Sequence, residues 1–234
     1  MPNYRRLRTP GSTYFFTVVT HERKRILCEV FARQALRAAI EEAGTRYPFR
    51  VEAWVLLPDH LHCIWSLPEG DADYSRRWGM IKAGFTKREQ KAGLIVAAED
   101  PEAASRIRHR DAFVWQRRFW EHQIRGQDDF NRHCDYIHYN PVKHGLVDDP
   151  KEWEYSTVHK FIRNGFYEEN WGDSIPSVVL AMEVEQRKRQ SGGRCPPYMF
   201  SVRSISVGEA HRTWKRWLRP GYFNFRHSRH FSSL

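Results

Sequence analysis

Residues 49–57 and 60–67 are two mainly apolar stretches separated by one tight turn, and this pattern constrains the fold more than any other. The turn is the pair Pro58-Asp59, which favours a reversal of the chain. Both stretches contain the β-branched and aromatic residues that are typical of strands. The pattern therefore predicts a β-hairpin in the core of a sheet.

The segments around this hairpin predict an α+β fold. We expect a strand over residues 13–20 and helices over residues 29–46 and 74–91. Residues 113–115 and 119–124 should add either an edge strand or a further hairpin. The order β-α-β-β-α-β is that of a split βαβ sandwich, an antiparallel sheet with helices on one face. A further helix begins near Asp128. The alanine-rich, charged residues 93–111 are expected to form a variable connection.

Helix 74–91 should pack on the sheet through one side only. Trp78, Ile81 and Phe85 lie on that side, because residues three and four apart share a helix face. Arg76 and Arg77 are among the basic residues expected around the other side of the helix.

His60 and His62 begin the second strand of the predicted hairpin. Side chains alternate between the faces of a sheet, so both imidazoles point the same way and Leu61 points into the core. Two imidazoles on one face can hold one divalent metal ion. A His-x-His pair alone is more often part of a polar sheet face, so a second motif is needed to favour a metal site.

The second motif is residues 136–140, in a stretch with helical spacing. Tyr136 and Asn140 are four residues apart and would project together. Tyr139 is a rival nucleophile, but it lies well round the helix from the line that joins Tyr136 and Asn140. We therefore favour Tyr136, and expect His138 on the helix surface and His144 in the loop that follows.

At these residues the chain resembles the HUH-type single-tyrosine transposases of the IS200-like superfamily, and most closely the REP-associated tyrosine transposases. The resemblance covers about residues 4–165. It is carried by His60-Leu61-His62, by Tyr136 and Asn140 at the spacing of the family's Tyr-x-x-x-(Gln/Asn) motif, and by the segment 140–147. Asn140 in place of the commoner Gln, with Pro141 directly after it, is similar to the REP-associated branch.

This resemblance implies a ferredoxin-like sandwich with a separate helix for the catalytic tyrosine. It implies that Tyr136 is the nucleophile and that His60, His62 and Asn140 hold a divalent ion. Neutral ligands of this kind favour Mg²⁺ or Mn²⁺. The implied activity is that of a metal-dependent single-stranded DNA endonuclease and strand transferase. Its substrates would be REP-type palindromic hairpins, its intermediate a covalent phosphotyrosine, and the protein a monomer.

Two rival functions fit the same residues. The first is a non-catalytic module that binds hairpin DNA or RNA and carries a vestigial site. The second is a metal-dependent phosphoesterase that uses water in place of Tyr136. Only the transposase forms a covalent protein–DNA adduct, so that adduct separates the three.

Charge is distributed unevenly along the chain and divides it into two parts. Residues 183–234 contain eleven Lys and Arg against three Asp and Glu, and so account for +8 of the net charge of +10. We expect a transposase domain over 1–182 and a basic extension of low order over 183–234. A basic arm favours a nucleic-acid partner, although a simply solvated tail has the same composition.

Further basic residues are candidates for DNA contacts, with plain solvation as the alternative: Arg106, Arg108, Arg110, Arg117, Arg118, Lys143 and His144. The four cysteines are far apart and form no Cys-x-x-Cys pair, which favours a reducing compartment. No apolar stretch approaches the ~20 residues that span a bilayer. We therefore expect a cytoplasmic, nucleoid-associated protein without membrane partners.

Overall fold

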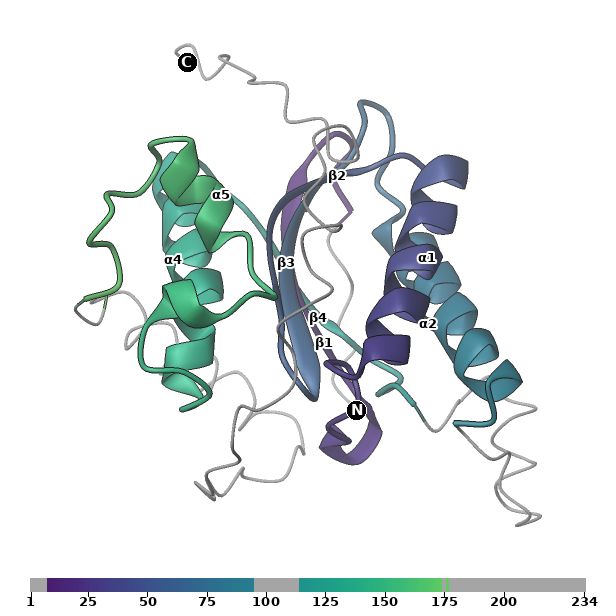
Figure 1. The fold of residues 1–234 in the computed structure, drawn as a ribbon. Coiled ribbons are helices and arrows are strands. Elements are labelled where there is room, and N and C mark those ends of the chain that lie inside the picture. The colour runs from purple at the N-terminus through teal and green to yellow at the C-terminus, as the bar shows by residue number, and fades with distance from the viewer. Residues whose placement is uncertain (1–7, 95–113, 174–175, 177–234) are drawn as a thin grey trace, which may run out of the picture. The chain divides into compact units, whose positions relative to one another are not determined.

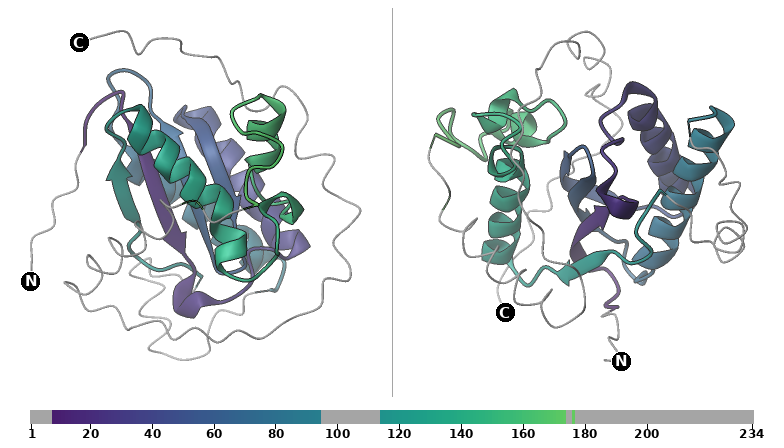
Figure 2. Two further views of the ribbon diagram at one scale, coloured as in Figure 1. Left: turned by 90° about the vertical axis from the view of Figure 1, so that its left-hand side faces the viewer. Right: turned by 90° about the horizontal axis from the view of Figure 1, so that it is seen from below.

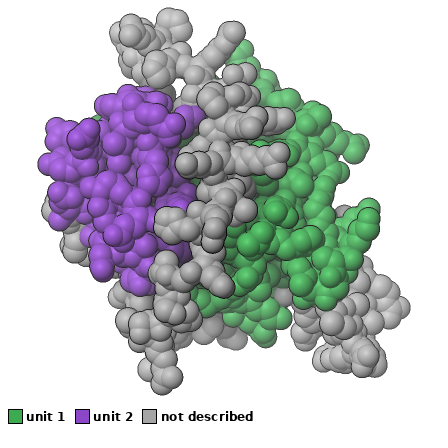
Figure 3. All heavy atoms as spheres, in the orientation of Figure 1, with its two compact units in different colours: residues 1–133 green, residues 134–234 purple. Residues whose placement is uncertain are grey.

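The computed structural model describes residues 8–94, 114–173 and 176. The chain forms two compact units, residues 1–133 and residues 134–234 (Figure 3). The division falls within helix α4 (Gln127–Lys143). In the part of the chain that the structure describes, no helix is both long enough and apolar enough to cross a membrane.

A four-stranded antiparallel sheet forms the framework of the first unit (Figure 1). Its strands are β1 (Thr13–Val19), β2 (Arg50–Leu56), β3 (His60–Ser66) and β4 (Trp120–Gln123), in the spatial order β2-β3-β1-β4. Helix α1 (Val30–Arg46) connects β1 to β2, and α2 (Tyr74–Lys91) lies between β3 and β4 in the chain. This is the split βαβ plan, so the predicted ferredoxin-like α+β fold is confirmed.

Helices α1 and α2 lie side by side on one face of this sheet (Figures 1 and 2). Trp65 of β3 stacks on Trp78 of α2, with ring centroids 4.2 Å apart and the planes 16° from parallel. Leu61 is two pleats from Trp65 and points the same way, whereas His60 and His62 point to the opposite face. The predicted orientation is confirmed, because the rings of His60 and His62 lie together, with centroids 4.9 Å apart, while Leu61 shares the face on which Trp65 packs against α2.

Arg77 is buried, so the prediction that it lies on the solvent side of α2 was wrong. Only 1% of its surface is exposed. Its guanidinium forms two hydrogen bonds with the carboxylate of Asp71, at 3.1 and 2.7 Å, and donates to the carbonyls of Tyr47, Pro48 and Asp73. The arginine therefore ties the start of α2 to the chain that follows α1, and these acceptors compensate for its burial.

The segment that follows residue 113 forms an edge strand rather than a further hairpin. β4 pairs with β1 through Tyr14–Gln123 and Thr17–Trp120, and Trp115 forms an isolated bridge with Thr20. The predicted connection over 93–111 lies almost entirely outside the described residues.

In the second unit, the end of α4 follows from the Pro141–Gly145 sequence. Gly145 has a positive φ of 63°. Its N–H donates to Val142, and the N–H of Leu146 donates to Pro141, which is the Schellman pattern of helix termination. The short helices η2 (Pro150–Glu152) and α5 (Val158–Arg163) follow.

A partly buried polar network joins α4 to the chain around α5. Tyr167 donates to Asp135, His138 Nδ1 bonds to Tyr167 Oη at 2.9 Å, and His138 Nε2 bonds to Thr157 Oγ1 at 2.8 Å. His138 is fully buried, so its predicted place on the helix surface was wrong. Burial lowers the pKa of His138 to about 3, which keeps it neutral. A neutral ring can accept from Thr157 while it donates to Tyr167.

Candidate active site

His60 and His62 form a convergent pair at the start of β3. Their ring centroids are 4.9 Å apart and their planes are 84° apart. Only 3% of His60 and 2% of His62 is exposed. β3 lies between β2 and β1, so His62 pairs with a residue on each side, while His60 pairs with β1 and its carbonyl accepts from the N–H of Leu57. The sheet therefore holds the two imidazoles in a fixed relation.

Each of these histidines has a partner on its Nδ1 atom. His62 Nδ1 bonds to Oγ1 of Thr17, directly across the β1–β3 ladder, at 2.8 Å. His60 Nδ1 bonds to a carboxylate oxygen of Asp59 at 2.7 Å, and Arg23 donates to the other oxygen at 2.9 Å. With Nδ1 engaged, Nε2 is the ring nitrogen that can bind a metal ion, which is how metal-binding histidines are commonly oriented.

Asp59 is held in its ionised form. Burial raises its pKa, but the hydrogen bonds and charges of His60 and Arg23 outweigh burial and hold the pKa well below the usual range. An ionised carboxylate on His60 Nδ1 fixes the proton on that nitrogen and makes Nε2 more basic.

In the second unit, Tyr136, Asn140 and Lys143 share one face of α4. They stand at positions i, i+4 and i+7, which a helix brings into line. Lys143 Nζ donates to Tyr136 Oη at 3.1 Å and lies 4.6 Å from the centroid of its ring. Asn140 Nδ2 donates to the carbonyl of Tyr136 at 3.5 Å. The predicted common face of Tyr136 and Asn140 is thus present in the helix.

Asn140 Oδ1 fits a metal-ligand role. The side chain is fully buried, and among the described residues this oxygen has no hydrogen-bond partner. A buried amide oxygen without a partner is energetically unfavourable, and a bound cation compensates for it. Carbonyl-type oxygens are also the ligands that Mg²⁺ and Mn²⁺ prefer.

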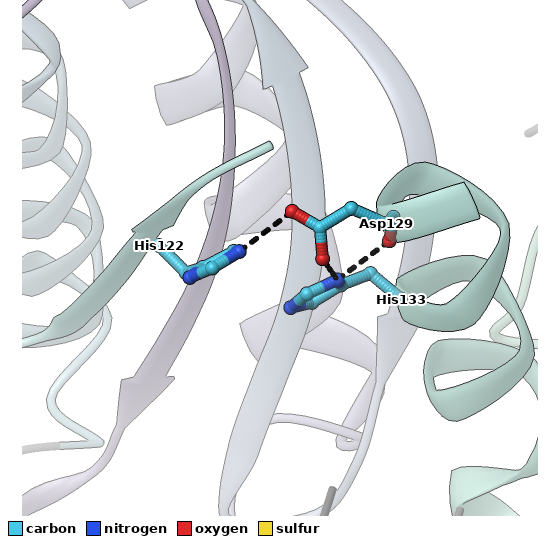
Figure 4. A group of neighbouring side chains, drawn as sticks. All are labelled: His122, Asp129 and His133. Atoms are coloured by element: carbon cyan, nitrogen blue, oxygen red, sulfur yellow. Dashed lines mark hydrogen bonds and ion pairs between the residues drawn. The ribbon is translucent and has the colours of Figure 1, made fainter. Parts of the chain in front are cut away.

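A second group of residues whose side chains could bind a metal ion lies in the first unit: His122 of β4 with Asp129 and His133 of α4 (Figure 4). Their ligand atoms lie within 4.8 Å of one another, so the group could hold a metal ion. In this structure Asp129 bonds to His122 Nε2 at 2.8 Å and lies 3.1 Å from His133 Nδ1, and Arg125 N–H also donates to it. The carboxylate thus links the edge strand to the start of the helix.

His133 should make the stability of the first unit depend on pH. Burial lowers its pKa to about 4, and the pKa of Asp129 is also lowered because its donors outweigh its burial. Between about pH 6.5 and pH 4, His133 is protonated in the unfolded chain but neutral in the folded chain. The free energy of unfolding therefore decreases as the pH is lowered through this range. The loss from pH 7 to pH 5 should be about 2 kcal/mol.

Urea unfolding at pH 7 and pH 5 measures this effect. His133→Asn retains a donor near the Nδ1 position and removes the titration, so it should reduce the difference between the two pH values. His144→Asn, at an exposed position, is the matched control and should leave the difference unchanged. An equal pH difference in the parent and in His133→Asn would contradict the assignment.

The predicted DNA-binding residues fall into two groups. Arg117, Arg118 and His144 are exposed, and Lys143 is half-buried against Tyr136. Arg106, Arg108 and Arg110 lie outside the described residues, as does the predicted basic extension over 183–234.

Comparisons with known proteins place the chain in a family. A REP-associated tyrosine transposase of Escherichia coli K12 is 41% identical over 176 residues, which cover 75% of this chain and 93% of that protein. The chain belongs to the REP-associated tyrosine transposases. A Haemophilus influenzae relative assigned to the same family is 40% identical over 184 residues, 79% of this chain and all of the relative. A comparison with protein-family models returned no match.

A solved structure of a REP-associated tyrosine transposase bound to a REP hairpin has the same fold. It is 40% identical, superposes with a TM-score of 0.61, and the match covers 76% of this chain and 94% of that one. The resemblance drawn from the His-Leu-His and Tyr-x-x-x-Asn motifs is therefore confirmed at the level of the family.

Three residues of the candidate site were not assigned their contacts from sequence. Thr17 and Asp59 hold the two histidines, and Lys143, expected only as a DNA contact, bonds to Tyr136. Asp59 was detectable, since a carboxylate directly before a histidine can reach its ring. Thr17 was not, because its contact depends on the β1–β3 register.

Proposed function

We propose that this REP-associated tyrosine transposase cleaves and rejoins single-stranded DNA beside a palindromic hairpin, through a covalent bond to Tyr136. The observation that best supports the proposal is the set of side chains on one face of α4, where the tyrosine oxygen accepts from Lys143 and the Asn140 oxygen lacks a partner. Family membership and a relative bound to a REP hairpin support the DNA substrate.

The proposed chemistry is a transesterification. Tyr136 Oη forms a bond to the scissile phosphorus, the bond from phosphorus to the neighbouring nucleotide's oxygen breaks, and the phenolic proton passes through solvent to that oxygen. The phosphotyrosine conserves the energy of the original bond, so a DNA hydroxyl can later displace the tyrosine and rejoin the strand. No nucleotide cofactor is required.

A divalent ion, Mg²⁺ or Mn²⁺, is part of the proposal. His60 and His62 would hold it through Nε2, and Asn140 would complete the protein ligands through Oδ1. Such an ion supplies positive charge for the non-bridging oxygens of the phosphate and fixes its orientation. Thr17 and Asp59 would keep both rings oriented whether or not the ion is bound.

His60→Ala and His62→Ala should abolish cleavage of a single-stranded hairpin substrate. Hairpin affinity should change little, since phosphate and base contacts supply most of it. Asn140→Ala should cause a smaller loss that high Mn²⁺ partly restores. Gel assays of cleavage and of binding, each with a Mn²⁺ titration, measure these effects.

The second histidine group provides the matched control. His122→Gln removes a possible ligand from the cluster with Asp129 and His133 and should leave cleavage and its metal dependence unchanged. Cleavage that persists in EDTA would rule out the metal requirement. Loss of cleavage in His122→Gln together with full activity of His60→Ala would indicate that the catalytic metal binds His122, Asp129 and His133 instead.

A hairpin-binding protein without catalysis is the alternative. On that alternative, Tyr136 and Asn140 are structural residues and no covalent adduct forms with any hairpin substrate. Denaturing gel electrophoresis of protein and labelled DNA after incubation with Mn²⁺ separates the two functions, because only a covalent adduct survives denaturation.

We further propose that residues 183–234 form an extension that adds affinity for DNA. Its charge of +8 would release counterions on binding, so a chain that ends at residue 182 should show a flatter salt dependence. The slope of log K against log salt should fall by about 0.9 for each contact with a duplex phosphate that is lost. Fluorescence anisotropy at a series of salt concentrations measures it. Equal slopes would show that the extension does not contact DNA.

A further inference from the structure

Lys143 makes a contact that neither its helix position nor a role in DNA binding explains. A lysine in the last turn of a helix is favoured there by the helix dipole and normally extends into water. Here the side chain runs back by two turns, and Nζ donates to Tyr136 Oη at 3.1 Å. The same ammonium lies 4.6 Å from the centroid of the tyrosine ring, a distance that allows cation–π attraction.

This contact involves the atom that the proposed function makes the nucleophile. Rotation about the Cζ–Oη bond redirects the lone pairs of the phenolic oxygen, and the hydrogen bond from Lys143 restricts that rotation because it engages one lone pair. In-line attack requires the oxygen to stand about 3–3.5 Å from phosphorus with a lone pair aimed at it. The ammonium at 3.1 Å from Oη would then be near the non-bridging oxygens of the same phosphate. It has three N–H donors, of which the tyrosine takes one.

We infer that Lys143 is a catalytic residue of the strand-transfer reaction, which orients Tyr136 Oη and stabilises the charge that builds on the scissile phosphate. The inference rests on the proposed role of Tyr136. In cleavage the Oη–P bond forms, the bond from phosphorus to the neighbouring nucleotide's oxygen breaks, and Lys143 keeps its three protons. In rejoining, the same ammonium donates to the departing tyrosine oxygen.

Asn140 and Lys143 would therefore act on the reaction in different ways. Asn140 offers a neutral oxygen to a cation, whereas Lys143 offers a fixed positive charge and a donor to the nucleophile. Loss of Asn140 should change the metal dependence of adduct formation. Loss of Lys143 should change the rate at saturating metal and leave the metal dependence as it was.

Single-turnover formation of the adduct with a labelled REP-type hairpin and its flanking single strand tests this inference. Lys143→Met keeps the aliphatic stem and removes the charge, so the rate should fall by about 100-fold, as for loss of one transition-state donor. Hairpin affinity should stay within about threefold, since a phosphate contact is only one among several. Lys143→Arg keeps charge and donors and should recover the rate to within about tenfold of the parent.

Lys151→Met is the matched control in the same unit, because Lys151 bonds to Asp149 and Asp173 and not to the tyrosine. It should leave the rate unchanged. A Lys143→Met rate equal to that of the parent, or a loss of rate wholly explained by weaker hairpin binding, would overturn the inference. A Lys143→Arg rate as low as that of Lys143→Met would also overturn it. If the parent itself forms no adduct, the proposed function fails first, and that result is visible before any variant is compared.

Discussion

Tyr136→Phe is expected to bind the hairpin as tightly as the parent and to form neither a nick nor a covalent adduct. The substitution removes one oxygen from a buried ring and leaves its packing in place. That oxygen is the proposed nucleophile, so its loss removes the atom that would bond to phosphorus. Denaturing gels and mass spectrometry of the trapped peptide measure the result.

Tyr139→Phe is the matched control for this experiment. Both tyrosines are buried on α4, but Tyr139 is about 60° round the helix from Tyr136, on the side away from Asn140, and about 100° from Asn140 itself. It should form the adduct within about tenfold of the parent, or ~1.4 kcal/mol. A DNA-linked peptide modified on Tyr139, or full nicking by Tyr136→Phe, would reverse the assignment.

Arg77→Met is expected to lower the free energy of unfolding of the first unit by about 3 kcal/mol. The substitution leaves the carbonyls of Tyr47, Pro48 and Asp73 without their donor inside the protein. Asp71 also loses its partner, but it is half-buried, and water screens part of that loss. Urea unfolding followed by tryptophan fluorescence measures the change.

Arg76→Met, one residue earlier in α2, gives the comparison. The Arg76 side chain is 59% exposed and its ion pair with Asp73 is 3.4 Å long, so its removal should cost less than about 1 kcal/mol. Equal losses for the two variants would show that the buried hydrogen bonds of Arg77 contribute nothing beyond its charge.

Local sequence patterns predicted the framework of the fold well. The apolar stretches around Pro58-Asp59 became β2 and β3, and helix α2 begins and ends where its apolar spacing predicts. These features depend on neighbours within a few residues, such as the cap that Asp73 provides for the N–H of Arg76. The orientation of His60 and His62 followed from strand alternation alone.

Buried polar residues were harder to predict. Arg77 and His138 were both expected at the surface of their helices, since charged and polar side chains usually lie there. Both are buried because distant segments supply acceptors and donors: the chain after α1 for Arg77, and Thr157 and Tyr167 for His138. Helical periodicity contains no information about such partners.

The cluster of His122, Asp129 and His133 shows the same limit. Its members come from a strand and a helix that a short loop connects, at spacings that match no familiar ligand motif. Lys143 was found as a basic residue, but its bond to Tyr136 depends on the path of a long side chain. The sequence therefore indicated pairings between adjacent residues, such as Asp59 with His60, but not pairings between distant segments or along a long side chain.

The central place of β3 in the sheet has a consequence for how a cation would bind. Since β1 and β2 pair with β3 on both sides, the amide protons of residues 60–63 should exchange with deuterium among the slowest in the first unit. A metal ion that binds His60 and His62 would then restrict the backbone of β3 little further, because the sheet already holds it. Metal binding should therefore leave the amide hydrogen exchange rates of β3 almost unchanged. The main free-energy cost of binding should be the loss of the ion's hydration shell.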